Sequence, residues 1–238
     1  MANVDNHFLT TKSISVVLAA YNEIDNLEPV LQRTLRVLKQ LTPAYEVIIV
    51  DDGSTDGTGQ LTDDLAARCE RVSVVHHGQN RGFGASLITG YANSSRDWIA
   101  PLPADGQIPP EELKKFVSLM TDADMVIGVP AQRSYNAYRK ALHFGVNMLT
   151  RVLVDRNPPP SADCCMFRRE VFQNVRLVGR SGFANSEFSI KAARQGYRLA
   201  TVKVETASRL SGSSKVTNLR TMFATVWDMI RSHQGSRV

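Results

Sequence analysis

A buried strand that ends directly in two acids constrains this chain more than any other feature. Residues 45–50 form an apolar, mostly β-branched run, and Asp51 and Asp52 follow at once with a glycine. In parallel α/β sheets such junctions lie at the carboxyl end of a strand, where side chains enter a crevice. A second run, which begins at Trp98, leads to Asp105 in a similar way. Two such ends predict one polar site at one edge of a sheet.

Strands and helices alternate along most of the chain. Continuous apolar runs predict buried strands, and apolar residues three and four apart predict helices. This alternation is typical of an α/β protein with a mainly parallel sheet and helices on both faces. We expect strands at Ser13–Ala20, Val47–Val50, Val72–His76, from Trp98, Met125–Val129 and Arg198–Val204. We expect helices at Asp25–Leu41, Thr58–Cys69, Ala85–Asn93, Pro109 to about Met120, Tyr138–Val154, Glu187–Gln195 and Leu219–Ile230.

The charges divide the chain into two halves. Residues 1–130 hold 10 basic and 17 acidic side chains, whereas residues 131–238 hold 18 and 6. An acidic half suits cations, and a basic half suits phosphates, nucleic acid or an anionic membrane. The basic half is explained equally well as a solvated face. A length of 238 residues with 43% apolar side chains is enough to bury the core of one domain.

Location and redox state follow from two further features. No apolar run approaches the roughly 20 residues that span a bilayer, and the first twelve residues are too polar for a secretory signal. We therefore expect a cytoplasmic protein, soluble or peripheral on a membrane. The three cysteines, Cys69, Cys164 and Cys165, are odd in number and two are adjacent. This pattern predicts reduced, structural thiols.

Two common motifs are incomplete. The spacing of Asp52, Ser54 and Asp56 is close to a calcium loop, but a strand precedes them where that motif needs a helix. One of these acids could instead cap the following helix. Residues 80–86 are rich in glycine but lack the third glycine of a dinucleotide fingerprint, which disfavours a nicotinamide oxidoreductase. Such a loop before a helix can still hold a phosphate or a base edge.

Three ordered motifs at strand ends carry a family resemblance. They are Tyr21-Asn22-Glu23, Asp51-Asp52-Gly53-Ser54-Thr55-Asp56 and Asn80-Arg81-Gly82-Phe83-Gly84. From Ser15 to Lys215 the chain resembles the family 2 glycosyltransferases, in particular the polyprenyl-phosphate sugar transferases of the dolichyl-phosphate mannosyltransferase type. The resemblance implies a GT-A nucleotide-diphospho-sugar transferase fold. It also implies inverting transfer of a sugar from a nucleoside-diphosphate sugar.

The resemblance also implies the residues that bind the donor. Ala19, Tyr21 and Glu23 would line the base and ribose, and Asp52 would lie at the base. The full expected set for the nucleotide sugar is Ala19, Tyr21, Glu23, Asp52, Ser54, Arg81, Gly82, Ala104 and Asp105. Asp105 would hold a divalent metal, Mg²⁺ or Mn²⁺, with Gln107. Pro103 replaces the first acid of the family's Asp-x-Asp, and the loss of one hard oxygen ligand should weaken metal binding.

The acceptor side is implied by a second set of residues. Arg209, Ser214 and Lys215 match an Arg-x-x-Gly-x-Ser-Lys loop that resembles the family's phosphate clamp. Asp105, Glu187, Arg209 and Lys215 are the expected catalytic residues. Glu187 stands where related enzymes place a base, but it is equally explained as a first-turn helix acid. Asp163 stands where the family has glycine, so the resemblance does not specify which acceptor the protein uses.

We therefore expect a single catalytic domain over residues 1–238, with 1–130 binding the nucleotide sugar and 131–238 the acceptor. The first hypothesis is a lipid-phosphate acceptor, such as a polyprenyl or dolichyl phosphate, with possible peripheral membrane contact and no nucleic acid. The alternatives are a soluble acceptor and a nucleotide-sugar-binding protein without catalysis. The apolar stripe of the expected last helix, which includes Trp227, fits docking on the core or a membrane interface.

Overall fold

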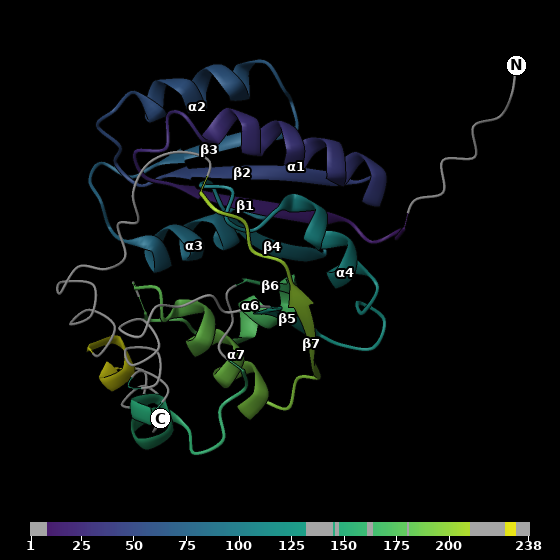
Figure 1. Ribbon diagram of the computed structural model, residues 1–238, viewed down its shortest axis with the longest axis vertical. Coiled ribbons are helices and arrows are strands. Elements are labelled where there is room, and N and C mark those ends of the chain that lie inside the picture. The colour runs from purple at the N-terminus through teal and green to yellow at the C-terminus, as the bar shows by residue number, and fades with distance from the viewer. Residues whose placement is uncertain are drawn as a thin grey trace, which may run out of the picture.

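One seven-stranded sheet crosses the protein, with helices on both of its faces (Figure 1). The computed structural model describes residues 9–131, 145, 148–160, 164–179, 181–209 and 227–231. The strand order is β3-β2-β1-β4-β6-β5-β7. The strands are β1 (Ile14–Ala20), β2 (Tyr45–Asp51), β3 (Val72–His76), β4 (Trp98–Pro103), β5 (Met125–Pro130), β6 (Cys164–Arg168) and β7 (Leu199–Val204). Apart from β6 every pairing is parallel, so the predicted α/β architecture is confirmed.

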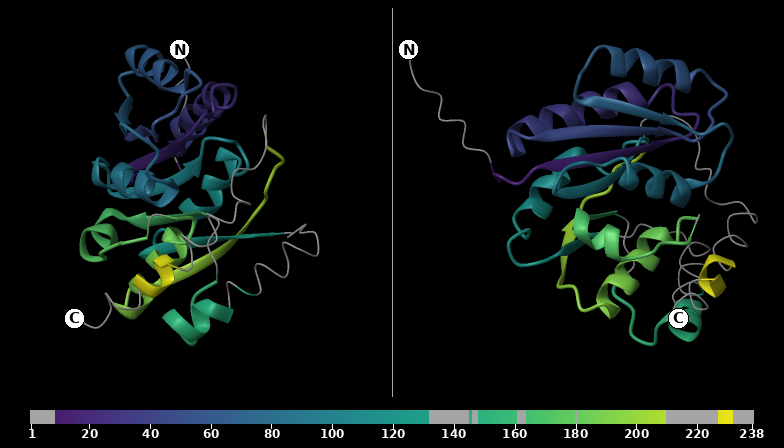
Figure 2. Two further views of the ribbon diagram at one scale, coloured as in Figure 1. Left: turned by 90° about the vertical axis from the view of Figure 1, so that its left-hand side faces the viewer. Right: turned by 180° about the vertical axis from the view of Figure 1, so that it is seen from behind.

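Each face of the sheet has its own core, because side chains alternate along a strand. The helices are α1 (Leu27–Leu41), α2 (Thr58–Ala67), α3 (Phe83–Ala92), η1 (Pro110–Glu112), α4 (Leu113–Val117), η2 (Thr150–Val154), α6 (Arg169–Asn174) and α7 (Ala184–Arg194). Side chains of α1, α2 and α4 pack on one face of the sheet, and those of α3, α6 and α7 pack on the other. Two further views show both layers of helices (Figure 2).

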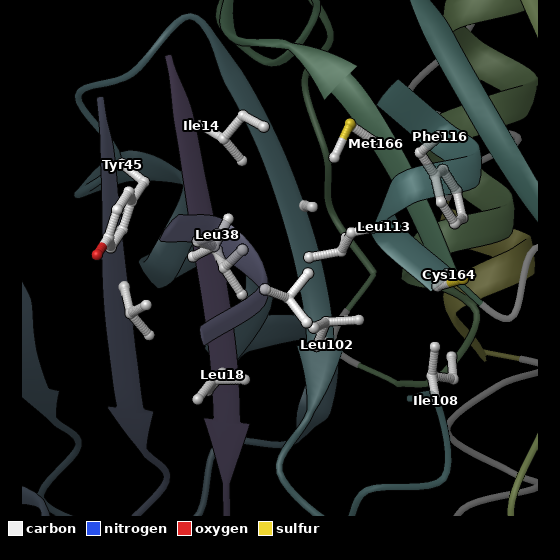
Figure 3. Packing of buried hydrophobic residues seen from close by; sticks show 14 of the residues in the cluster. Ile14, Leu18, Leu38, Tyr45, Leu102, Ile108, Leu113, Phe116, Cys164 and Met166 are labelled. Carbon is white, nitrogen blue, oxygen red and sulfur yellow. The ribbon is translucent and has the colours of Figure 1, made fainter. Parts of the chain in front are cut away.

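The first core shows why the apolar spacing of α1 predicts a helix. Its buried residues recur three and four positions apart and form one stripe that faces β1. In Figure 3, Leu38 of this stripe lies over β1 between Ile14 and Leu18, and Leu113 of α4 lies toward Leu102 of β4. Both helices therefore seal the same face of the central strands.

The three central strands end at the same edge of the sheet. β1 lies between β2 and β4, with Ala20 paired to Asp51 and Ala19 paired to Pro103. Each strand is followed by a polar loop, so these loops start side by side. This edge is the predicted location of the site.

Strand β6 was missed by the sequence prediction. It runs antiparallel between β4 and β5, and its pairing with β4 covers only Trp98 and Ile99. Pro101 and Pro103 follow, and neither has a backbone N–H that could donate a further hydrogen bond to a neighbouring strand. The β4–β6 ladder therefore stops before the carboxyl edge. The strand has only four apolar residues before Arg168, and so short a run has no period that separates a strand from a buried loop, which explains the omission.

Several predicted helix bounds were wrong. The helix predicted for Thr58–Cys69 ends at Ala67, and Asp56 takes the capping role by accepting hydrogen bonds from the Thr58 N–H and hydroxyl. The helix predicted from Pro109 to Met120 is the short pair η1 and α4. The helix predicted from Glu187 begins at Ala184. Most of the helices predicted for 138–154 and 219–230, together with Asp163, Ser214 and Lys215, lies outside the described residues.

The cysteines are free thiols, as expected. Cys164 and Cys165 are buried in β6, on opposite faces of the sheet. Burial raises the pKa of Cys165 to about 12, so its thiol stays protonated and unreactive at neutral pH. Among the described residues, no helix combines the length and hydropathy that a bilayer span requires.

Helix α3 lies unusually close to β1, and this contact generates the first prediction. A Cβ at Gly90 would lie 2.2 Å from Cγ1 of Val17. Replacing an interior helix glycine by alanine normally stabilises by about 0.5–1 kcal/mol. We expect Gly90→Ala to destabilise instead, by about 1–3 kcal/mol, because Val17 is a stiff buried side chain that cannot move aside.

Urea unfolding measures this change, and Gly78→Ala is the matched control. Gly78 is exposed and a Cβ there would meet nothing within 4 Å. Gly78→Ala should leave the free energy of unfolding nearly unchanged. A stabilised Gly90→Ala protein would show that α3 and β1 are not in close contact.

His76 links α2 to the sheet edge and predicts a pH dependence. Its ring nitrogens lie 3.0 Å from Asp51 and 3.0 Å from Asp63. Hydrogen bonding to Asp51, and then to Asp63, raises the pKa of His76 above its ordinary value. A raised folded-state pKa stabilises the fold below the unfolded-state pKa of about 6.5, and this contribution disappears as pH rises through the folded-state pKa.

We therefore expect His76→Gln to lower the free energy of unfolding at about pH 5.5 and to have little effect at about pH 9. Urea unfolding of both proteins across this range measures the difference. His76 is exposed enough that the effect should be modest. A difference that grows with rising pH would contradict the ion pairs.

Candidate active site

The loops after β1 and β2 are joined by reciprocal hydrogen bonds. The N–H of Asn22 donates to Oγ of Ser54 at 2.9 Å, and the N–H of Thr55 donates to Oδ1 of Asn22 at 2.8 Å. Asn22 has a φ of 53°, in the left-handed region that asparagine tolerates better than most residues. Asn22 and Ser54 therefore position the two loops against each other and set the direction of Tyr21 and Glu23.

Asp52 fixes the glycine-containing loop that follows β3. Its carboxylate is 3% exposed and accepts hydrogen bonds from the backbone N–H groups of Arg81 and Gly82, both at 2.9 Å. Nδ1 of His77 lies 2.7 Å from the same carboxylate, and Nε2 of His77 lies 3.0 Å from the hydroxyl of Thr89. With the proton on Nδ1, His77 donates to Asp52 and accepts from Thr89. The third motif is thus held to the second by a buried charge.

Gly53 allows the same two loops to come into contact. Its φ is 71°, and a Cβ at this position would lie 2.5 Å from the carbonyl carbon of Gln79. Any other residue would be strained by both the backbone angle and the contact. The glycine of the second motif is therefore required by the close approach of residues 79–80.

Asp105 lies in the turn after β4 and meets a cation from the C-terminal part of the chain. Its Oδ1 accepts a hydrogen bond from the N–H of Gln107 at 2.9 Å, and its Oδ2 lies 3.1 Å from Nη2 of Arg209. The same Nη2 lies 2.5 Å from Oε1 of Glu23. Glu23 and Asp105 are 7% and 9% exposed, so both charges are largely removed from water. Arg209 therefore joins the loops after β1 and β4 through one nitrogen atom.

The segment between β7 and Arg209 is anchored along its length. The N–H of Glu205 donates to Glu112 at 3.0 Å, and Lys115 donates to the same carboxylate at 2.7 Å. The N–H of Ala207 donates to the carbonyl of Gln107 at 2.9 Å. These contacts carry the end of the described C-terminal segment, residues 205–209, across the sheet edge to Asp105.

The remaining predicted donor residues lie on the same loops. Ala19 ends the β1 ladder beside β4, and Ala104, 1% exposed, donates its N–H to the carbonyl of Ala19 at 3.4 Å. Tyr21 follows in the β1 loop, and Arg81 is exposed at the tip of the third motif. The predicted residues from the first half thus gather at one edge, whereas Ser214 and Lys215 lie outside the described residues.

Whether this edge could hold a metal ion depends on the oxygen and nitrogen ligands around Asp105. Among the described residues, no group of three or more His, Cys, Asp or Glu side chains is arranged to hold a metal ion. Gln107 is exposed, and its backbone, not its side chain, contacts Asp105. Two carboxylates, Asp105 and Glu23, converge on one cationic nitrogen. This pair fits a hard cation that takes its other ligands from diphosphate oxygens and water.

The carboxylate of Glu187 contacts residues of its own segment. Its side chain is fully buried, accepts a hydrogen bond from the N–H of Gly179 at 2.8 Å, and lies 2.6 Å from Nζ of Lys191. The buried carboxylate of Asp228 holds the same loop by accepting from the N–H of Ser181 at 2.8 Å. Glu187 thus lies in the first turn of α7, with its carboxylate bound to neighbouring residues of its own segment.

Sequence reasoning did not identify His77, and it named Asn22 without a role. Both act on other site residues through hydrogen bonds. His77 follows β3 directly, at the same sheet edge as Asp52, and this position is the signal that could have drawn attention to it. Asn22 lies inside the first motif, but its left-handed backbone cannot be read from the residues alone.

Comparison with known proteins shows the family and the fold of this chain. The profile of glycosyl transferase family 2 matches residues 15–176. Undecaprenyl-phosphate 4-deoxy-4-formamido-L-arabinose transferases from Yersinia enterocolitica and Serratia proteamaculans are each 30% identical to this chain. These alignments span 221 and 224 residues and cover 92% of this chain and 67% of each relative.

Two solved structures share the fold. Glucosyl-3-phosphoglycerate synthase from Mycobacterium tuberculosis, in complex with Mn²⁺, UDP and glucosyl-3-phosphoglycerate, matches with a TM-score of 0.68 at 20% identity, over 94% of this chain and 79% of that one. A mannosyltransferase from Pyrobaculum calidifontis, in complex with GDP-mannose and Mn²⁺, matches with a TM-score of 0.64 at 18% identity, over 95% and 74%. The fold is therefore GT-A, as predicted. With the family profile and the relatives, it shows that this chain is a glycosyltransferase and belongs to glycosyl transferase family 2.

Proposed function

We propose that this protein transfers a sugar, with inversion, from a nucleoside-diphosphate sugar to a polyprenyl phosphate. The observation that carries the proposal is the meeting of Glu23, Asp105 and Arg209 at the carboxyl edge of the sheet. At this point two carboxylates, which can bind the sugar donor and a divalent cation, meet a guanidinium, which can bind a phosphate. The relatives named as undecaprenyl-phosphate transferases support the lipid acceptor.

The donor base and ribose would lie over the joined loops after β1, β2 and β3. Ala19, Tyr21, Glu23 and Asp52 line this edge, and Ser54 orients the β1 loop through Asn22. Asp52 holds the backbone at Arg81 and Gly82, so it shapes the wall against which the nucleotide lies. Residues 1–130 would thus bind the nucleotide sugar and residues 131–238 the acceptor, within one catalytic domain.

Asp105 and Gln107 would hold a divalent metal, and Ala104 would lie beside it. When bound, such a metal neutralises the negative charge that develops on the departing diphosphate. The solved relatives with Mn²⁺ support a metal in this family. Pro103 in place of an acid leaves Asp105 as the one carboxylate of the motif.

Transfer to a phosphate needs little proton movement. A phosphate oxygen attacks the anomeric carbon from the side opposite the diphosphate, the new C–O bond forms, and the bond to the diphosphate oxygen breaks. The phosphate is already ionised, so no strong base is required. Arg209, with Ser214 and Lys215, would hold this phosphate in place. The buried contacts of Glu187 with Gly179 and Lys191 argue against proton abstraction by this carboxylate.

An exposed apolar patch in the second half supports contact with a membrane. Met148, Val152 and Trp227 are 58%, 72% and 56% exposed. They come from the helix ending in η2 and from residues 227–231, which lie side by side in Figures 1 and 2 and share a buried cluster through Val154 and Met229. Arg151 and Arg231 are exposed on the same two helices, and Arg231 lies 5.4 Å from the Trp227 ring. Apolar side chains beside arginines suit an anionic bilayer surface.

Residues 227–231, the described end of the expected last helix, combine a buried and an exposed apolar side chain. Met229 is fully buried against Phe183 and Ile190 of the α7 region, so this end docks on helices and not on the sheet. Trp227, two residues earlier, is exposed. The protein would thus work at the periphery of a membrane, where a polyprenyl phosphate resides.

The transfer reaction tests the role of Asp105. We expect Asp105→Asn to lower kcat/KM by at least about a hundredfold, because the charge on the leaving diphosphate loses its support. Transfer is measured from UDP- and GDP-sugars to undecaprenyl phosphate in the presence of Mn²⁺. Asp122→Asn, at an exposed acid away from the site, should keep full activity. Full activity in Asp105→Asn, or transfer to soluble acceptors alone, would contradict the proposal.

Vesicle flotation tests the membrane patch. We expect the native protein to float with vesicles that contain anionic lipid at low salt. The double variant Val152→Ser with Trp227→Ser should bind at least about tenfold more weakly, because each apolar side chain contributes about 1.5–3 kcal/mol when buried. Leu9→Ser, which removes an equally exposed apolar side chain, is the control and should float normally. Equal flotation of the double variant would place the contact elsewhere.

A further inference from the structure

Arg209 occupies a position that two carboxylates define together. One guanidinium nitrogen lies 2.5 Å from Glu23 and 3.1 Å from Asp105, so one oxygen of each acid is directed at a single point. The two acids come from different loops, and both are nearly buried. A point that receives oxygens from two buried carboxylates favours a cation of any kind.

The other oxygens of the two acids are held by the protein itself. Oε2 of Glu23 accepts from the side-chain amide of Asn26 at 2.6 Å, and Oδ1 of Asp105 accepts from the N–H of Gln107 at 2.9 Å. These contacts orient each carboxylate so that its remaining oxygen faces Arg209. The pair would therefore keep its orientation if Arg209 withdrew.

Among Glu23, Asp105 and Arg209, the arginine has the longest side chain, with the most rotatable bonds. Glu23 is held by the cap of α1, and Asp105 by the turn after β4. The backbone before Arg209 is fixed at Glu205 and Ala207, so the Arg209 side chain can change its conformation while that backbone stays in place. An arginine side chain has enough rotatable bonds for such a change.

We infer that Glu23 and Asp105 form one cation position that Arg209 and the divalent metal occupy in turn. Glu23 supplies the carboxylate that is missing at Pro103, from a loop outside the usual motif. This inference rests on the proposed function, because it assigns the metal of that reaction a second ligand and a competitor. With a metal held by Glu23 and Asp105, the guanidinium of Arg209 would be available to the acceptor phosphate. Metal and acceptor phosphate therefore bind with positive coupling, which is reciprocal.

Direct measurement of Mn²⁺ binding tests the shared position without any turnover. Electron paramagnetic resonance of free Mn²⁺ gives its dissociation constant for the full chain. We expect Arg209→Gln to bind Mn²⁺ at least about threefold more tightly than the native protein, because a competing cation is gone. Arg209→Lys keeps a competing charge and should stay close to native. Arg33→Gln removes an arginine from a surface ion pair with Glu111 and should have no effect.

Substitutions of the two acids should change Mn²⁺ affinity in the opposite direction to Arg209→Gln. Glu23→Gln and Asp105→Asn should each weaken Mn²⁺ binding by at least about tenfold, because each removes a charged ligand. Misfolding would weaken Mn²⁺ binding. Tighter Mn²⁺ binding by Arg209→Gln therefore cannot be explained by misfolding. Unchanged or weaker binding in Arg209→Gln, or unchanged binding in Glu23→Gln, would overturn the inference. Unchanged binding in Asp105→Asn would instead overturn the metal role in the proposed function.

A short lipid phosphate tests the coupling. Farnesyl phosphate should bind the native protein at least about threefold more tightly with saturating Mn²⁺ than without it, as isothermal calorimetry would show. In Arg209→Gln this dependence on Mn²⁺ should disappear. If binding of farnesyl phosphate still depends on Mn²⁺ in Arg209→Gln, or does not depend on it in the native protein, Arg209 does not exchange its contact with the two acids for a contact with the phosphate.

Discussion

The ion pairs of Arg209 hold together parts of the chain that are far apart in sequence. Its Nη2 contacts Glu23 in the loop after β1 and Asp105 in the loop after β4, about 190 and 100 residues earlier. Buried charges are costly unless they are paired, so the two acids at this sheet edge need a cation between them, and Arg209 supplies it. The acidic first half and the basic second half of the chain meet at this point. The charge division seen in the sequence therefore has a structural counterpart at the site.

Backbone geometry makes this edge compact enough for the charges to meet. Gly53 lets residues 79–80 pass against the β2 loop, and Asn22 turns the β1 loop toward Ser54. Pro101 and Pro103 end the pairing of β4 with β6, so β4 leaves the ladder before Asp105. Pro103 thus shapes the strand end before Asp105, and Glu23 from the loop after β1 meets Asp105 at Arg209.

Much of this arrangement could be predicted from the sequence, because it depends on local patterns. Continuous apolar runs located the parallel strands, and acids directly after β2 and β4 indicated which edge carries the site. The contacts that could not be predicted are those between distant segments. Nothing near Arg209 indicates that it pairs with Glu23, since loop composition suggests only a phosphate ligand. Strand β6 is too short to show a period, and the burial of Glu187 depends on Gly179 and Lys191, which contact it only in the folded chain.

The two acids that end the central strands are held in different ways, and this difference separates a fixed part of the site from a changeable one. Asp52 is bound by backbone N–H groups and by a buried histidine, all of which belong to the packed sheet edge. Its environment can change only if the loop itself unfolds. Asp105 is bound by a long, flexible side chain at the end of an anchored segment. Ligands that alter the charge at this edge should therefore move Arg209 and leave the loops after β2 and β3 in place.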